Sequence, residues 1–508
     1  MTSRKLAALL LSALAFVPLC NGAAYMNPVV KVADLGVIAG PPASGQANPQ
    51  CRFTLIGSNL WFTTSQGGEA GVGTVSMFDP GTSNITQLAT FDNVSGKAPW
   101  SASLMLAAGK AWFTTSSGGN GNKGTLVSIQ TNYPYAMSVA FHFPTNNDAL
   151  TNNYGQAPHS TPVQIGDDLW LTCSGGGVVG SAFGSISKYN LTTGMLTNMF
   201  SLDQTNYGRQ PLGSSLVKVG NAYYYLTYAG GTNVAPGMTP TGGGILGRIT
   251  FDGLGQPTLT KLIDLVPGFG SFPAGDVVHD GSNYLYFTTV GTATNPGAIV
   301  RYSMPTGQLT NVFTFVTNTV ALTNYGKQPY GTPILYNNEL YFTTLSGGTL
   351  SKGVLAKLNL ADNTVTKLAD MEGIVGLALG GQPQYGGGTL YTNPATGRIS
   401  IYLPINKGGI YAPAGLTSGC GTILRVDMQP QPITTSISMP DTNHITLTWT
   451  GGYQPFDVLT DSSVTSFPAT SWPAAATGIN SPTGTGPWSV TLPVSGSPNY
   501  YYIRGQAQ

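Results

Sequence analysis

The stretch LTNYGKQPYGTPILYNNELYFTTLSGG spans Leu322 to Gly348, and its opening recurs twice earlier in the chain. Residues 150–162 read LTNNYGQAPHSTP, and residues 204–215 read QTNYGRQPLGSS. Each copy precedes a short apolar strand, a turn and a second strand related to LxFTT. The recurrence of NYGxxP therefore indicates a repeated structural unit.

Segments related to LxFTT occur seven times, at spacings of 51 to 62 residues. They begin at Leu60, Ala111, Leu169, Tyr223, Leu285, Leu340 and, in a degenerate form, Ile401. Around each segment, four short strands rich in aromatic and β-branched residues alternate with turn residues, which is typical of an antiparallel meander. Seven meanders of this length predict an all-β fold, a seven-bladed β-propeller.

A proline precedes the first strand of every unit, and in six units a glycine stands three residues earlier. The prolines are Pro49, Pro99, Pro158, Pro211, Pro273, Pro329 and Pro383. We interpret this element as the joint between blades, because Gly permits a positive φ and Pro fixes the backbone without donating to a ladder. In a four-stranded meander, the joints and the Gly-rich turns after LxFTT lie at one end, which we call the joint face.

The seventh unit lacks a fourth strand, because Pro430 and Pro432 follow its third strand at residues 421–428. Residues 28–49, at the other end of the chain, match the fourth strand and joint at residues 84–99. We therefore expect the N-terminal strand to complete blade seven, so that the ring has no open sheet edge.

Residues 1–24 have the pattern of a secretory signal peptide, with Arg4 and Lys5, an apolar run and small residues for cleavage. The apolar run of 14 residues is shorter than the roughly 20 that span a membrane. The sequence therefore predicts export, either secretion or display at the cell surface, without a transmembrane segment. A lipid-modified Cys20 is a minor alternative, because Leu19 stands where a small residue is expected.

Residues 28–428 resemble the secreted tandem-repeat proteins called GloVer, whose repeat joins Gly-x-x-Pro-x-Gly to LYGTTxxGGxxGxGTVF. SQGGEAGVGTVSMF at residues 65–78 carries the likeness, although Phe or Leu replaces the family's Gly in LYGTT. The resemblance implies a secreted or cell-surface propeller over residues 25–429, and it carries over no catalytic residue. Residues 430–508, with Trp449 in LTWT and the final strand NYYYIRG, resemble a small fibronectin type III-like β-sandwich.

Composition excludes several classes of function. Charged residues make up 8% of the chain and the formal net charge is +1, so nothing indicates a nucleic-acid partner. The four histidines are scattered, without HxxxH or DxDxDG spacing, so we predict no metal site. No Gly-rich element opens a helix, and we predict no cofactor.

The positions that follow the seven prolines differ from blade to blade, as expected of a binding surface on a constant scaffold. Aromatic rings stack on the apolar faces of sugars, while amides and cations bind hydroxyl groups. We therefore predict a glycan ligand, such as an extracellular polysaccharide or another cell-surface component. The predicted ligand-binding residues are Trp100, Tyr330, Gln50, Gln384, Lys97 and Lys327. The repeated Tyr154, Tyr207 and Tyr325 fit packing between blades better.

Catalysis has few candidates. Three Glu remain after the leader, which disfavours a glycosidase with two facing carboxylates. A polysaccharide lyase stays open, with His159, Tyr207, Arg209 and Asp276 as weak catalytic candidates. A structural surface-layer or filament subunit that self-assembles also stays open, since low charge and abundant Thr, Asn and Gly suit it. We favour a non-enzymatic binding or adhesion module.

Cys51, Cys173 and Cys420 remain after the leader, which allows one internal bridge and one free thiol. Cys51 follows the first joint, and Cys420 precedes the third strand of blade seven. We therefore predict a Cys51–Cys420 disulfide beside the ring closure, and a buried thiol at Cys173.

Overall fold

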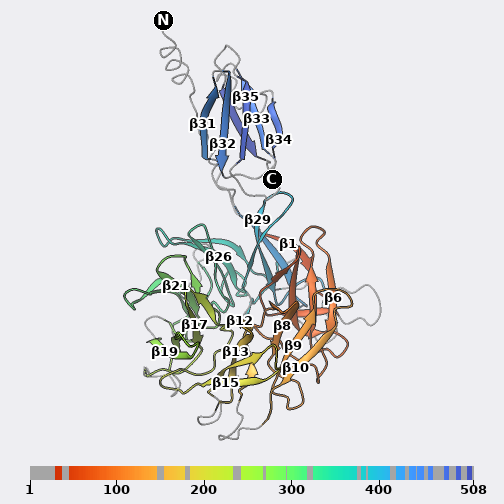
Figure 1. Cartoon of the computed structure of the whole chain (residues 1–508), viewed down its shortest axis with the longest axis vertical. Coiled ribbons are helices and arrows are strands. Elements are labelled where there is room, and N and C mark those ends of the chain that lie inside the picture. Colours follow the sequence, from red (N-terminus) through yellow and green to blue (C-terminus); the bar gives the residue numbers. More distant parts are fainter. Residues whose placement is uncertain are drawn as a thin grey trace. The chain divides into compact units, whose positions relative to one another are not determined.

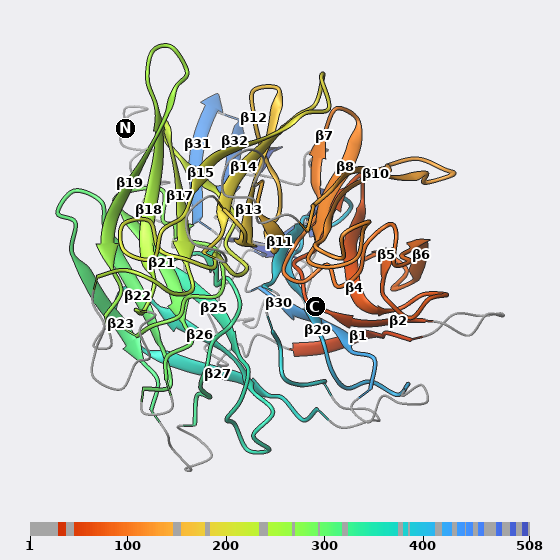
Figure 2. The same ribbon diagram turned by 90° about the horizontal axis from the view of Figure 1, so that it is seen from below.

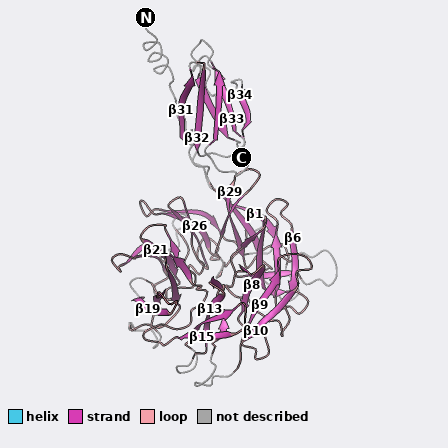
Figure 3. Ribbon diagram, viewed as in Figure 1, coloured by secondary structure: helices cyan, strands magenta, loops and turns pink. Residues whose placement is uncertain are grey.

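The structure is a computed structural model of the chain. It describes residues 29–36, 45–145, 154–177, 183–232, 242–266, 270–292, 295–316, 324–373, 379–384, 387–411, 419–428, 434–441, 443–450, 456–461, 474–479, 488–493 and 500–505. Within these ranges the secondary structure consists of strands and turns without a helix (Figure 3). The described segments accordingly contain no helix long and apolar enough to cross a membrane. The signal peptide predicted at residues 1–24 lies outside them.

The chain divides into two compact units. The larger unit comprises Val29–Thr389 and Tyr402–Arg425. The smaller unit contains Leu390–Ile401 together with the residues from Val426 onward. The prediction of repeated four-stranded antiparallel sheets is confirmed (Figure 1). We number these sheets in chain order.

Sheets 1 to 3 follow the predicted meander, and in sheets 1 and 3 the joint adds a short strand. Sheet 1 contains β2 (Gln46–Pro49), β3 (Thr54–Ile56), β4 (Asn59–Gly67), β5 (Thr74–Phe78) and β6 (Ile85–Thr90). Sheet 2 contains β7 (Met105–Ala107), β8 (Lys110–Thr115), β9 (Thr125–Gln130) and β10 (Met137–His142). Sheet 3 contains β11 (Gln156–Pro158), β12 (Val163–Ile165), β13 (Asp168–Gly175), β14 (Ser185–Asn190) and β15 (Leu196–Ser201).

Sheets 4 to 6 each have four strands in sequence order. Sheet 4 contains β16 (Val217–Val219), β17 (Ala222–Thr227), β18 (Ile245–Phe251) and β19 (Pro257–Asp264). Sheet 5 contains β20 (Val278–His279), β21 (Tyr284–Thr289), β22 (Ala298–Ser303) and β23 (Leu309–Thr314). Sheet 6 contains β24 (Ile334–Tyr336), β25 (Glu339–Thr344), β26 (Val354–Asn359) and β27 (Val365–Asp370).

Sheet 7 combines both ends of the repeat region. Its strand order is β28 (Thr389–Thr392), β29 (Ile399–Ile405), β30 (Thr422–Asp427) and β1 (Val29–Asp34). The strand from the N-terminal side thus occupies the place of the fourth strand in this sheet.

The C-terminal residues form two three-stranded antiparallel sheets. One has the order β31 (Thr434–Asp441), β32 (His444–Thr450) and β35 (Trp488–Pro493), and the other β34 (Ala474–Ile479), β33 (Phe456–Asp461) and β36 (Tyr500–Gly505). Trp449, Leu447 and Leu492 of the first sheet share a buried core with Val458 and Ile503 of the second.

The main cores lie between consecutive sheets. Buried clusters join sheet 1 to 2, 2 to 3, 3 to 4, 4 to 5 and 5 to 6, and the sheets surround a common centre (Figure 2). The LxFTT strand of each sheet is almost continuously buried, and in sheets 2 to 5 a cluster lies against each face of the sheet. Trp61, Trp112 and Trp170 on these strands are 2%, 6% and 2% exposed, so they are core residues.

Close packing of glycine explains why NYGxxP and the GG turns recur. A Cβ on the joint glycine Gly326 would lie 1.9 Å from Thr344 Oγ1, the second Thr of LxFTT. A Cβ on Gly347, in the turn after the same strand, would lie 2.5 Å from Gly326 Cα. Bridges between joint and turn, such as Lys327 with Ser346, confirm that both lie at one end of the sheet. The two backbones touch, so neither position tolerates a side chain.

The residue before each joint proline also has a left-handed backbone. The residues are Asn48, Ala98, Ala157, Gln210, Phe272, Gln328 and Gln382, with φ between 49° and 62°. The sequence pattern placed the positive φ at the glycine alone, because a residue before proline favours extended conformations. The joint glycines of six units share it, so six of the seven joints contain two left-handed residues.

Candidate functional site

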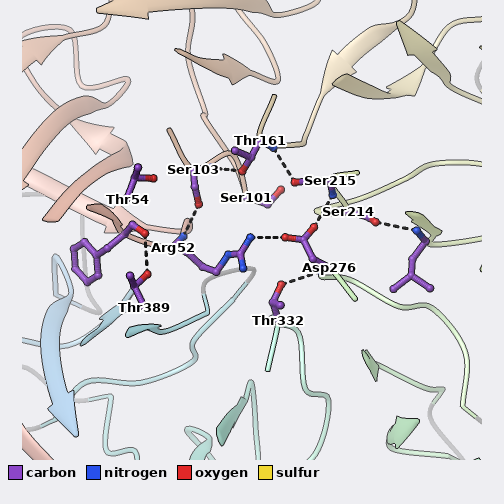
Figure 4. Close-up of polar contacts among 12 residues, drawn as sticks. Arg52, Thr54, Ser101, Ser103, Thr161, Ser214, Ser215, Asp276, Thr332 and Thr389 are labelled. Atoms are coloured by element: carbon purple, nitrogen blue, oxygen red, sulfur yellow. Dashed lines mark hydrogen bonds and ion pairs between the residues drawn. The ribbon is translucent and has the colours of Figure 1, made fainter. Parts of the chain in front are cut away.

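A circuit of hydrogen bonds links the starts of the inner strands at the joint face (Figure 4). In each of sheets 1 to 5, a backbone N–H donates to a side-chain oxygen at the equivalent position of the next sheet. The donor and acceptor pairs are Arg52–Ser103 (3.0 Å), Ser103–Thr161 (2.9 Å), Thr161–Ser215 (3.1 Å), Ser215–Asp276 (2.6 Å) and Asp276–Thr332 (2.8 Å). These bonds fix the relative positions of the loops that carry the candidate residues.

Arg52 and Asp276 form an ion pair between sheets 1 and 5, which are not neighbours in the circuit (Figure 4). The Asp276 side chain is only 5% exposed, whereas that of Arg52 is 35% exposed. One Asp276 oxygen accepts the Ser215 N–H and the other accepts the Arg52 guanidinium. Both carboxylate oxygens are therefore already bonded.

Gly387 provides the space for the Arg52 side chain. It occupies the equivalent position in sheet 7, because Thr389 donates to the Phe53 carbonyl just as Thr54 donates to the Leu104 carbonyl, both at 2.8 Å. A Cβ on Gly387 would lie 3.0 Å from Arg52 Cδ and 2.7 Å from the Thr332 carbonyl oxygen. Any side chain here would meet Arg52 or the neighbouring backbone.

Trp100 is the most exposed of the predicted ligand-binding aromatic residues, with 42% of its surface accessible. Its ring packs on that of His159, with centroids 5.8 Å apart and planes tilted by 36°. Burial lowers the pKa of His159 to about 4, so the imidazole is neutral at physiological pH. The indole thus lies on an uncharged aromatic support.

Three of the other predicted ligand-binding residues make hydrogen bonds with another side chain. Gln50 of sheet 1 donates from Nε2 to Gln384 Oε1 at 3.4 Å, so the structure brings these amides together. Tyr330 is half-buried and hydrogen-bonded to Tyr228, and burial raises its pKa.

Lys97 and Lys327 are half-buried joint residues in sheets 2 and 6, each bridged through its backbone to the adjacent turn. Two of the repeated tyrosines pack edge-on against a phenylalanine, Tyr154 on Phe141 at 5.6 Å and Tyr325 on Phe313 at 5.8 Å. This packing agrees with the structural role expected for them.

The four weak catalytic candidates do not form a constellation. Among the residues that the structure describes, no hydrogen bond, ion pair or ring contact joins any two of His159, Tyr207, Arg209 and Asp276. Tyr207 packs against the core between sheets 3 and 4, and Asp276 is occupied by Arg52 and Ser215.

The predicted Cys51–Cys420 disulfide is contradicted, because both residues are free buried thiols. Cys51 Sγ bonds within its own sheet, donating to the Thr63 carbonyl (3.5 Å) and accepting the Thr63 N–H (3.3 Å). Cys420 Sγ lies beside Gly36, where a Cβ would approach it to 2.7 Å. Burial raises the pKa of Cys420 to about 11. Cys173 is buried as predicted, with its pKa raised to about 12.

Arg52, Tyr228 and Phe272 were missed by sequence reasoning. The circuit position falls three residues after the joint proline in some sheets and four in others, so a fixed offset hides it. Tyr228 stands where sheets 1 to 3 have serine after LxFTT, and this departure from the repeat was a usable signal. In the described segments, no group of three His, Cys, Asp or Glu could hold a metal ion.

No protein-family model and no curated protein matches the chain. Among solved structures, it is similar to TolB from Acinetobacter baumannii (13% identity, TM-score 0.32, covering 58% of this chain and 59% of that one). It is also similar to oligogalacturonate lyase from Vibrio parahaemolyticus (12% identity, TM-score 0.45, covering 80% and 99%).

A third similar structure is a puromycin-hydrolyzing peptidase from Mycobacterium tuberculosis (12% identity, TM-score 0.43, covering 82% of this chain and 62% of that one). The chain thus spans less than two thirds of TolB and of this peptidase. TolB and the lyase are β-propeller-type folds. With TM-scores below 0.5, these similarities assign no activity to the chain.

Proposed function

We propose that residues 25–429 form a seven-bladed β-propeller sealed by the N-terminal strand. A repeated backbone bond supports closure: the N–H before a joint proline donates to a carbonyl of the preceding sheet. The bonds are Ala157–Lys123 (2.8 Å), Gln210–Phe183 (2.8 Å), Phe272–Gly243 (2.8 Å), Gln328–Pro296 (2.8 Å) and Gln382–Lys352 (2.7 Å). Asn48 donates to the Cys420 carbonyl at 2.7 Å, which joins sheet 7 to sheet 1 in the same way.

The propeller is proposed to be an exported binding or adhesion module for glycans, with its site on the joint face. The observation that carries this proposal is Trp100, a large exposed ring supported by the neutral His159. Aromatic platforms of this kind stack on sugar rings. The Gln50–Gln384 amides and the Arg52 guanidinium belong to the same face and supply hydrogen-bonding groups for sugar hydroxyls.

Two properties favour binding over a lyase reaction. Each oxygen of Asp276 already accepts a hydrogen bond from the protein, one from the Ser215 N–H and one from the Arg52 guanidinium, and these bonds hold the carboxylate in a structural role. His159 is buried and its pKa of about 4 makes it a weak base.

The flanking segments complete the proposal. Residues 1–24 direct export to the medium or the cell surface, and residues 430–508 form an appended fibronectin type III-like sandwich. We also propose that residues 28–428 belong to the GloVer-type proteins, which the repeat motif supports.

Retention of the full-length chain on immobilised cellulose, chitin, xylan, alginate and polygalacturonate tests the function. We expect retention on at least one of them, and Trp100→Ala should weaken it roughly tenfold because a stacking ring is lost. Tyr133→Ala is the matched control. Tyr133 is 85% exposed and lies between β9 and β10, at the end opposite the joint face.

Three outcomes would contradict the proposal. Release of unsaturated ends from a polysaccharide would make the protein a lyase. Ordered self-assembly without retention on any glycan would favour a structural subunit. Equal loss of retention in Trp100→Ala and Tyr133→Ala would remove the joint face as the site.

A further inference from the structure

The turn after LxFTT is built differently in sheet 4. In sheets 1 to 3 the side chain of a serine ties this turn to the joint. The bonds run from Ser65 to the Asn48 carbonyl (3.0 Å), Ser116 to Ala98 (2.8 Å) and Ser174 to Ala157 (3.0 Å). In sheet 4 the residue is Tyr228, and its backbone N–H makes the tie to the Gln210 carbonyl at 2.9 Å. The scaffold therefore does not require the Tyr228 side chain.

Phe272 departs from the repeat at a second position. It precedes the joint proline of sheet 5 with φ of 62°, where the other joints have Asn, Ala or Gln. A bulky side chain in the left-handed region is unfavourable, and such residues gather at functional sites. Because the other joints hold smaller or polar residues at this position, the fold does not require a phenylalanine here, and its presence indicates a role other than forming the joint.

These two departures meet at one place. The rings of Tyr228 and Phe272 lie 5.0 Å apart and are tilted by 31°, and Tyr228 is hydrogen-bonded to Tyr330. The three residues come from the end of β17, the joint into sheet 5 and the start of sheet 6. All three residues are half-buried, not enclosed in the core.

We infer that Tyr228, Phe272 and Tyr330 form a second sugar-binding subsite. Stacked rings with two phenol hydroxyls suit a sugar residue, because they offer an apolar platform with donors and acceptors at its edge. Trp100 and His159 belong to sheets 2 and 3, whereas this cluster belongs to sheets 4 to 6. The ligand is therefore a chain of sugar residues that reaches both platforms, and this inference rests on the proposed glycan binding.

Substitutions that restore the repeat's own residues give the sharpest test. Tyr228→Ser introduces the residue of sheets 1 to 3, and Phe272→Gln introduces that of the joints at Gln210 and Gln328. Both variants should therefore keep the wild-type Tm. The probes are the dimer and the octamer of whichever panel polysaccharide retains the full-length chain, measured by calorimetry.

Each variant should weaken octamer binding about tenfold, the effect of losing one stacked ring. Trp100→Ala should do the same for the octamer. The dimer fills one subsite at a time, so loss of either platform should change its affinity no more than about twofold. Tyr228→Phe keeps the ring and should retain most of the octamer affinity.

The possible failures can be told apart. If Trp100→Ala weakens octamer binding while Tyr228→Ser and Phe272→Gln do not, the second subsite is wrong and the proposed function stands. A lower Tm with unchanged octamer affinity in those two variants would make the cluster a packing feature. If no panel glycan retains the wild-type chain, the proposed function and the second subsite fall together.

Discussion

Sheets 1 to 3 and sheets 4 to 6 have the same backbone at the joint face but use different side chains there. In the first group, the serine half, Ser65, Ser116 and Ser174 tie the turn to the joint through their hydroxyls. In the second, the apolar half, the same position holds Tyr228, Val290 and Leu345, which make the tie through backbone N–H groups alone.

The difference shows which parts of the repeat the fold needs. Backbone bonds, glycine contacts and left-handed residues recur in both halves, so they specify the joint. The side chain after LxFTT is free to change once the backbone supplies the bond. In sheet 4 this freedom is used to place the Tyr228 ring beside Phe272, so a unit can acquire a new side chain without a change in the backbone of the repeat.

The largest expected effect tests whether the scaffold is the same in both halves. Gly96→Ala and Gly326→Ala would place a Cβ 2.3 Å from Thr115 Oγ1 and 1.9 Å from Thr344 Oγ1, at φ of 124° and 81°. We expect each to lower the free energy of unfolding by about 2–5 kcal/mol, from left-handed strain and overpacking. Thermal and urea unfolding should show similar losses in both halves.

Gly109→Ala is the matched control, because Gly109 has φ of 73° and open space around the added Cβ. This substitution should lower the free energy of unfolding only by the left-handed strain, about 1–2 kcal/mol. A loss in Gly326→Ala no greater than this would show that the glycine contact is not what defines the joint.

Acid should lower the stability of the protein through His159, a residue of the serine half. His159 has its pKa lowered from 6.5 to about 4 by burial, so between these values the unfolded chain binds a proton that the folded chain does not. Stability is therefore complete above about pH 7 and falls as the pH drops through 6.5 towards 4, with an upper limit of ~3 kcal/mol. Tyr330, at the equivalent position of the apolar half, stays neutral throughout this range.

The measurement is Tm against pH for the wild type and for His159→Gln, whose profile should be flatter. His279→Gln serves as control, since this histidine lies on β20, away from the joint face. If the two variants keep the same acid-induced loss as the wild type, His159 is not its source.

The smallest expected effect concerns the serine ties themselves. Ser116→Ala removes one hydrogen bond to the Ala98 carbonyl, and the backbone N–H of Ser116 still donates to that carbonyl at 3.1 Å. The loss of stability should be about 0.5–1.5 kcal/mol. Ser138→Ala, at an exposed site on β10, should change it less. Equal effects in calorimetry would mean that the side-chain tie is dispensable in the serine half as well.

Sequence reasoning captured what is local and repeated. The Gly-x-x-Pro spacing and the LxFTT strands predicted four-stranded sheets, and the meander geometry predicted that joints and GG turns meet, as Lys97 and Ser117 do.

The candidate site depended on contacts between sheets, which no local pattern encodes. The ion pair between Arg52 and Asp276 joins residues from separate sheets, and the sequence around either residue gives no signal of this pairing. Cys51 and Cys420 flank the closure in sequence but bond or pack within their own sheets. At six of the seven joints the left-handed residue before the proline overrides a local preference because the neighbouring sheet accepts its N–H.

The glycine at position 387 has a consequence for how this repeat chain could be edited or evolve. Copying unit 2 into the place of unit 7 would bring a serine side chain to the point where Arg52 passes, and Arg52 would lose its route to Asp276. Units that look interchangeable in an alignment are thus assigned to fixed places, since unit 1 supplies the arginine, unit 5 the carboxylate and unit 7 the gap between them. Duplication, deletion or shuffling of single units should be tolerated least where it separates these three.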